Sequence, residues 1–207
     1  MGSLDSPRIF TVSAGEPDPQ LIAQAAALLR DGGLVAFPTE TVYGLAADAG
    51  NASAIERLNQ VKGRPPDKPY SIHLHDAAQI RDFVETIPPA AQRLIERFWP
   101  GPLTIVIPAK RAGSVGFRLP NHPVAQAFLK ACGRAVVAPS ANRSGFAPPT
   151  DGQEVRAALG GQFDCLLDAG PTALGRESSV VSVTSDGIAV LREGAIPAKM
   201  IEDAARA

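Results

Sequence analysis

The chain has 207 residues, of which 45% are hydrophobic and 20% are charged. This is enough apolar sequence for the core of one ordinary domain, and it excludes wholesale disorder. A formal net charge of −1 excludes the strongly basic composition of a general nucleic-acid binder, and two cysteines exclude a disulfide scaffold. No apolar run is long enough for a membrane span, so we expect a cytoplasmic protein. We expect one domain over residues 1–207, with a flexible terminus at residues 1–7.

The predicted elements alternate between helices and strands along the chain. A helix begins at Pro19 behind the N-cap Asp18, and a buried strand over residues 34–37 follows it. Further helices are predicted over residues 51–61, 76–84, 89–99, 124–132, 151–159 and 197–205. Further strands are predicted over residues 70–74, 103–107, 135–138, 165–168, 179–183 and 188–191. This order predicts an α/β fold in which helices flank a mixed parallel and antiparallel sheet.

Polar side chains directly follow two of the predicted strands. Two threonines and a glutamate lie within residues 38–45, and Ser140 and Asn142 lie two positions apart after the strand at 135–138. Open α/β sheets bind ligands outside the carboxyl ends of their strands, where hydroxyls and amides can bond phosphate or ribose. Each segment taken alone is also typical of an ordinary turn or capped loop.

Three cations lie close together in residues 62–69. Pro65 disfavours a helical conformation for Arg64, so Lys62 and Arg64 are expected to point the same way along an extended chain, with Lys68 nearby. Lysine as a compact charge and arginine as a fork suit a polyphosphate. The prolines favour an anion site over the alternative, a solvated basic loop.

Arg118 has apolar neighbours in the sequence, which predicts that it is partly buried beside an anionic partner. That partner is either a structural carboxylate or the carboxylate of a ligand. His73 and His75 share a predicted strand, but they have no cysteine or third histidine near them, so no metal site is expected. The chain contains neither the Walker nor the Rossmann glycine motif, which excludes those two modes of nucleotide binding.

Six short stretches combine in a specific order and spacing, at residues 38–45, 62–69, 99–104, 138–145, 177–180 and 191–196. Together they resemble the YrdC-like family of threonylcarbamoyl-adenylate synthases, in its short form with a single catalytic domain. The resemblance extends over residues 23–201. It implies a twisted mixed sheet with flanking helices that curves around a concave, positively charged cavity.

The resemblance also implies an activity. A nucleotidyltransferase of this family condenses L-threonine, bicarbonate or CO₂, and ATP, which brings Mg²⁺, into threonylcarbamoyl-adenylate and pyrophosphate. A downstream transferase complex then modifies tRNA with the product. The residues that match the family's threonine pocket are Thr41, His73, Arg118, Ala138 and Ser178. Those that match its ATP site are Lys62, Arg64, Lys68, Ser114, Ser140, Asn142, Pro148 and Arg192. The resemblance implies catalytic roles for Lys62, Arg64 and His73, the last as a proton acceptor or as an orienting hydrogen-bond partner.

One departure and two alternatives stand beside this interpretation. Tyr70 and Ser71 replace two apolar residues that usually precede the family's histidine, so different local packing is expected there. The first alternative is a ribosome-assembly or double-stranded-RNA-binding protein that uses the same basic concave surface. The second is a relative that makes another carbamoyl-adenylate, as in hydrogenase maturation.

Overall fold

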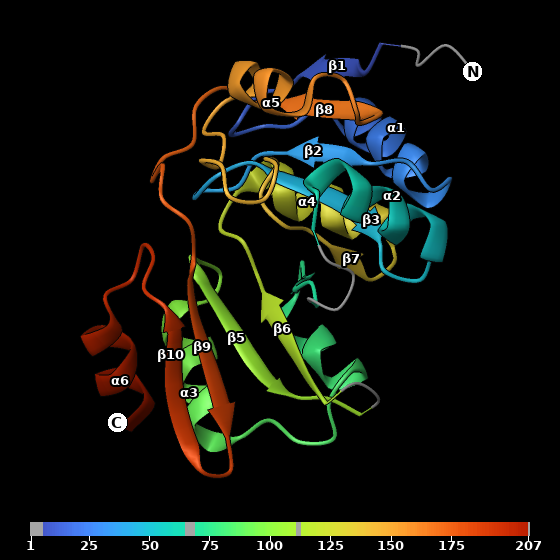
Figure 1. Cartoon of the computed structure of the whole chain (residues 1–207). Coiled ribbons are helices and arrows are strands. Elements are labelled where there is room, and N and C mark those ends of the chain that lie inside the picture. Colours follow the sequence, from blue (N-terminus) through green and yellow to red (C-terminus); the bar gives the residue numbers. More distant parts are fainter. Residues whose placement is uncertain (1–5, 65–68, 111–112, 207) are drawn as a thin grey trace.

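The computed structural model describes residues 6–64, 69–110 and 113–206 (Figure 1). Its strands are β1 (Arg8–Thr11), β2 (Val35–Phe37), β3 (Gly44–Asp48), β4 (Ile72–His73), β5 (Leu103–Pro108), β6 (Ser114–Arg118), β7 (Val136–Val137), β8 (Cys165–Asp168), β9 (Ser179–Thr184) and β10 (Gly187–Arg192). Its helices are α1 (Pro19–Arg30), α2 (Ala52–Lys62), the 3₁₀ helix η1 (Ala77–Asp82), α3 (Pro89–Phe98), α4 (Pro123–Cys132), α5 (Gly152–Leu159) and α6 (Ala198–Arg206).

The strands form one sheet in the order β1-β8-β2-β3-β7-β4-β6-β5-β9-β10. Four neighbouring pairs are parallel, namely β1–β8, β2–β8, β4–β6 and β5–β9, and the other pairs are antiparallel. The strands at the β1 end cross the upper part of Figure 1, whereas those at the β10 end run steeply through the lower part. The predicted mixed and twisted sheet is therefore confirmed.

The hydrophobic core lies on both faces of this sheet. On one face, α1 and α4 pack against strand residues that include Val35, Phe37 and Val136. On the opposite face, α2, α3, α5 and α6 belong to a second cluster that includes Ala36 and Ile105. Successive residues of a strand point to opposite faces, so a strand buried on both sides reads as a continuous apolar run.

The face that α1 and α4 cover continues past them along the sheet, and there its side chains line a cavity. The register shows the continuity, because His73 pairs with Val136 on one side and with Arg118 on the other. Thr104 and its neighbour across β5–β9, Val180, lie on this same face. Polar residues can occupy these strand positions because the positions line the cavity and lie outside the apolar cluster of α1 and α4.

Every predicted helix has a counterpart, although residues 77–82 form a 3₁₀ helix and not an α-helix. The sequence missed three strands, β1, β3 and β6. Glycine and alanine, which have low strand propensity, fill most of β3, and a glycine interrupts β6, so neither segment carries a clear strand pattern. Pairing with neighbouring strands fixes their conformation instead. Of the expected flexible terminus, residues 1–5 lie outside the described residues.

None of the helices in the described ranges is long and apolar enough to cross a membrane.

Candidate active site

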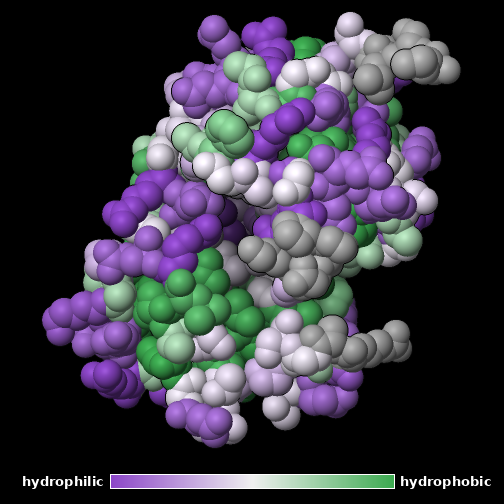
Figure 2. All heavy atoms as spheres, in the orientation of Figure 1, coloured by the Kyte–Doolittle hydropathy of each residue, from purple (hydrophilic) through white to green (hydrophobic). Residues whose placement is uncertain are grey.

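A cavity of about 580 Å³ opens where the uncovered sheet face meets the loop that follows β7. Figure 2 shows a hollow with hydrophilic residues around it between the two halves of the molecule, and a hydrophobic patch on the lower half. Most of the predicted site residues line this cavity together, namely Lys62, Arg64, His73, Arg118, Ala138, Ser140, Asn142, Ser178 and Arg192. Segments up to 150 positions apart in the chain therefore converge here, since Val42 and Arg192 share the lining.

Three predicted residues of the described part of the chain do not line the cavity, and a fourth falls outside that part. Thr41 is buried behind Arg118 and contacts it, so it acts on the cavity through that arginine. Ser114 is exposed at the opposite end of β6 from Arg118. Pro148 lines a neighbouring hollow, to which Phe146 also belongs. Lys68 lies outside the described residues.

The end of α2 brings the first two cations to the cavity. Gly63 ends the helix in the left-handed conformation, at φ +58°, which allows the chain to turn directly after Lys62. Arg64 lies after this turn, where its guanidinium donates to Pro69 O at 2.9 Å and packs 4.6 Å from the centroid of the Tyr70 ring. Tyr70, which departs from the family pattern, thus gives Arg64 an aromatic surface.

Lys62 connects the basic segment to the loop that follows β7. Its Nζ donates to Ser140 O and lies 3.5 Å from Asn142 Oδ1, and its own carbonyl accepts from Ser144 N at 2.8 Å. Lys62 is only 3% exposed. Burial, and to a smaller extent the nearby charge of Arg64, lower the pKa of Lys62 to about 8. A cation, a hydroxyl residue and an amide are thereby held as one unit.

His73 is buried on β4 between an aromatic ring and a cation. Its ring meets Phe37 edge-on, with the centroids 6.3 Å apart. Burial, and then the charge of Arg118, lower the pKa of His73 to about 3, so the imidazole is neutral near pH 7. A group with so low a pKa is a poor proton acceptor at that pH. Of the two roles implied by the resemblance, the neutral state of the buried imidazole favours the orienting one. Its Nδ1 has no hydrogen-bond partner among the described residues.

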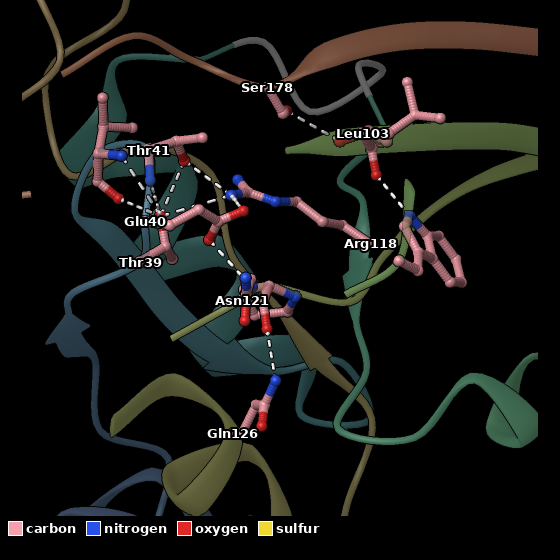
Figure 3. A network of polar contacts seen from close by, with 12 residues as sticks. Thr39, Glu40, Thr41, Leu103, Arg118, Asn121, Gln126 and Ser178 are labelled. Atoms are coloured by element: carbon pink, nitrogen blue, oxygen red, sulfur yellow. Dashed lines mark hydrogen bonds and ion pairs between the residues drawn. The ribbon is translucent and has the colours of Figure 1, made fainter. Parts of the chain in front are cut away.

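Arg118 reaches from β6 toward the segment after β2 (Figure 3). Its Nη2 donates to Thr41 Oγ1 at 2.7 Å and to Glu40 Oε1 at 3.0 Å. The partner that the sequence left open is therefore a structural carboxylate on this side of the guanidinium. Arg118 Nε is buried and has no partner in the described part of the chain, and the side chain lines the cavity. The guanidinium thus retains donor capacity for a ligand.

Glu40 and Glu177 are site residues that the sequence did not predict. Taken alone, the segment 38–45 is typical of a capped loop, and Thr39 Oγ1 does accept from the N–H groups of Thr41 and Val42. The Glu40 carboxylate in the same segment pairs with Arg118. Glu177 is the one acidic residue of the cavity lining as far as the described residues show, and it pairs with Arg192 at 2.8 Å. The motifs contained both glutamates, but sequence alone gave no sign of their partners.

The β9–β10 hairpin places Arg192 beside Ser178. The guanidinium of Arg192 donates to Ser178 O from Nη2 at 2.9 Å and from Nε at 3.1 Å. Ser178 Oγ lies 3.0 Å from Thr104 Oγ1. Among the described residues, the cavity lining has four cationic side chains and one carboxylate, which suits a ligand or ligand pair with several negative charges.

A sequence model of one family, Sua5_yciO_yrdC, described as "Telomere recombination", matches residues 27–194. The chain belongs to the Sua5/YciO/YrdC family. The family resemblance expected from the sequence is thus confirmed.

Family relatives of two sizes are similar to the chain. A threonylcarbamoyl-AMP synthase of Bacillus subtilis is 45% identical over 195 residues, which cover 89% of this chain and 56% of the relative. A protein of Mycobacterium tuberculosis named putative threonylcarbamoyl-AMP synthase is 36% identical over 191 residues, which cover 88% of each. The chain thus spans little more than half of the Bacillus relative.

A solved structure of the same family is Pyrococcus abyssi Sua5 complexed with L-threonine, which superposes with a TM-score of 0.90 at 38% identity. The match covers 95% of this chain and 60% of the other. These relatives support the synthase expectation and give no support to the RNA-binding alternative.

Proposed function

We propose that the chain is an L-threonylcarbamoyladenylate synthase. It would act as a nucleotidyltransferase that converts L-threonine, bicarbonate or CO₂, and ATP into threonylcarbamoyl-adenylate and pyrophosphate. The observation that carries the proposal is the convergence of Lys62, Arg64, Arg118 and Arg192 with hydroxyl and amide groups in one cavity. Its volume of about 580 Å³ is typical of a small-molecule site. The names of the relatives and the threonine in the Sua5 complex support the same activity.

Two regions of the cavity would bind the two larger substrates. The threonine carboxylate would pair with the available donors of Arg118, close to the neutral His73 and to Ser178. The triphosphate would lie against Lys62 and Arg64. Further donors would come from Ser140, Asn142 and Arg192. Ser114, Pro148 and Lys68 remain predicted contacts of ATP. A compact lysine and forked arginines are the side chains that proteins use for phosphate.

The reaction would proceed by two condensations in this cavity. The threonine ammonium first loses a proton to solvent, and the amine then attacks the carbon of CO₂. The new C–N bond releases a second proton to solvent and leaves a carbamate. With bicarbonate in place of CO₂, the attack releases water and no second proton. A carbamate oxygen then attacks the α-phosphorus of ATP, and the bond to pyrophosphate breaks. Neither step uses a covalent bond to the protein. The contribution of the chain is to place the reactants and to stabilise the charge on pyrophosphate through Lys62 and Arg64.

Mg²⁺ would enter as the counterion of ATP. No group of three histidine, cysteine or acidic side chains is close enough to hold a metal in the ranges that the structure describes. Mg²⁺ commonly binds through substrate phosphates with few protein ligands, so this donor set fits a metal that the nucleotide brings. Glu177 and Asn142 are the oxygen donors of the cavity that could contact it, and the ion would neutralise phosphate charge when bound.

The test is pyrophosphate release from ATP and bicarbonate, measured with threonine, with serine and without an amino acid. We expect release that depends on threonine and is slower with serine. Pyrophosphate release at the same rate with threonine, with serine and without an amino acid would contradict the proposal. So would an absence of release combined with steeply salt-dependent binding of double-stranded RNA, which would favour the alternative. The product would be consumed by a transferase that acts on tRNA.

A further inference from the structure

Glu40 is a buried carboxylate with a partner on each of its oxygens. It is 8% exposed, and Oε1 accepts from Arg118 Nη2 at 3.0 Å. Oε2 accepts from the backbone N–H of Asn121 at 3.1 Å. Its own carbonyl accepts from Leu174 N at 2.9 Å, so the backbone of the glutamate is held as well. A buried charge is tolerated only with such partners.

The two bonds of the Glu40 carboxylate act on one stretch of chain. Arg118 ends β6, and Asn121 follows it by three residues, so the carboxylate joins the arginine side chain to the backbone that leaves the strand. Figure 3 shows Glu40 lying between Arg118 and Asn121. Thr41 adds a second acceptor for the same nitrogen of the guanidinium. Because the guanidinium is planar, two acceptors at Nη2 also set the direction of its other donors.

We propose that Glu40 is a positioning residue that gives the cavity its preference for a ligand with a carboxylate. It does not contact the ligand itself but fixes Arg118, which lines the cavity and whose Nε has no partner among the described residues. The inference rests on the proposed function, since it takes threonine as the ligand. Glutamine cannot replace Glu40, because both oxygens accept from donors and an amide has only one acceptor atom. In Glu40→Gln, either Arg118 or the Asn121 N–H would therefore lose its acceptor.

The test uses calorimetric dissociation constants for three ligands, L-threonine, L-threoninamide and ATP, on the full chain. Threoninamide keeps the amine and the hydroxyl of threonine but lacks the carboxylate. We expect Glu40→Gln to weaken threonine binding about tenfold, the scale of a lost hydrogen bond to a charged group. Binding of threoninamide and ATP should stay within about twofold, because neither relies on the orientation of Arg118 toward a carboxylate. Glu56→Gln, an exposed glutamate on α2, is the matched control and should change none of the three.

A purely structural role for Glu40 would weaken all three ligands alike and would overturn the inference, as would unchanged threonine binding. If Glu40→Gln does not fold, Glu40→Asp serves instead, since it keeps the charge but withdraws it by one methylene. We then expect a threonine-selective loss of about threefold, and an unchanged preference for threonine over threoninamide would overturn the inference. Failure of the proposed function is distinct, because wild-type protein would then release no pyrophosphate in response to threonine.

Discussion

His73 and Arg118 lie side by side on β4 and β6, so the charge of the arginine adds to burial in keeping the imidazole neutral. The arginine is held by Glu40, and the histidine is neutral because burial and this cation lower its pKa to about 3. The resemblance to a known family named both residues, but their coupling depends on strand pairing. The pairing of β4 with β6 was not predictable, because the sequence did not identify β6 as a strand.

The depressed pKa of His73 predicts a loss of stability in acid. The native pKa of about 3 lies below the ordinary value of 6.5, so only the unfolded chain takes up a proton between these values. The contribution is fully present above about pH 6.5 and is lost as the pH falls toward 3. We expect the free energy of unfolding, measured with urea at pH 7.5 and 5, to fall more for wild type than for His73→Gln. An equal fall in both proteins would contradict the neutral state of His73.

The proposed role of Arg64 predicts a large loss of activity when it is replaced. Replacing it with alanine removes the guanidinium that packs on Tyr70. We expect kcat/KM for ATP to fall, by an amount that corresponds to a loss of about 2–4 kcal/mol of transition-state stabilisation. Steady-state pyrophosphate release measures this change. Arg97→Ala, an exposed arginine of α3, is the control and should leave the rate unchanged. Near-wild-type turnover by Arg64→Ala would contradict a role for Arg64 in catalysis.

At the scale of the element, the turn after α2 is the feature that directs Arg64. The sequence predicted this helix over residues 51–61, because the residues that begin and end a helix lie within or next to the segment itself. β3 was not predicted, since its glycine and alanines form a strand only through pairing with β2 and β7. Elements with local signals are therefore predictable, and elements that depend on distant partners are not.

The positive φ of Gly63 predicts a matched pair of variants. Gly63→Ala and Gly160→Ala both place a Cβ in the left-handed region, at φ +58° and +56°, and neither Cβ meets another atom within 4 Å. Each should cost about 1–2 kcal/mol of stability, measured by thermal or urea unfolding. Only Gly63→Ala should also raise the KM for ATP, because only that turn places Arg64. Equal KM values in the two variants would show that the turn does not serve the site.

At the scale of the whole molecule, the cavity forms where one face of the sheet extends beyond the part that α1 and α4 cover. The sequence predicted the α/β class from the alternation of elements, and the family resemblance supplied the concave shape. It could not separate Ser114 and Pro148 from the residues that share the cavity, because motif matches carry no distances. The sequence did not identify Glu40 either, because its role depends on a contact with Arg118, which lies on β6 and is distant in the chain.

The most direct measurement is a crystal structure of the protein with L-threonine and a non-hydrolysable ATP analogue. We expect both ligands in the one cavity, with the threonine carboxylate bonded to Arg118 and the phosphates bonded to Lys62 and Arg64. A nucleotide bound elsewhere, or threonine bound away from Arg118, would contradict the assignment of this cavity as the active site.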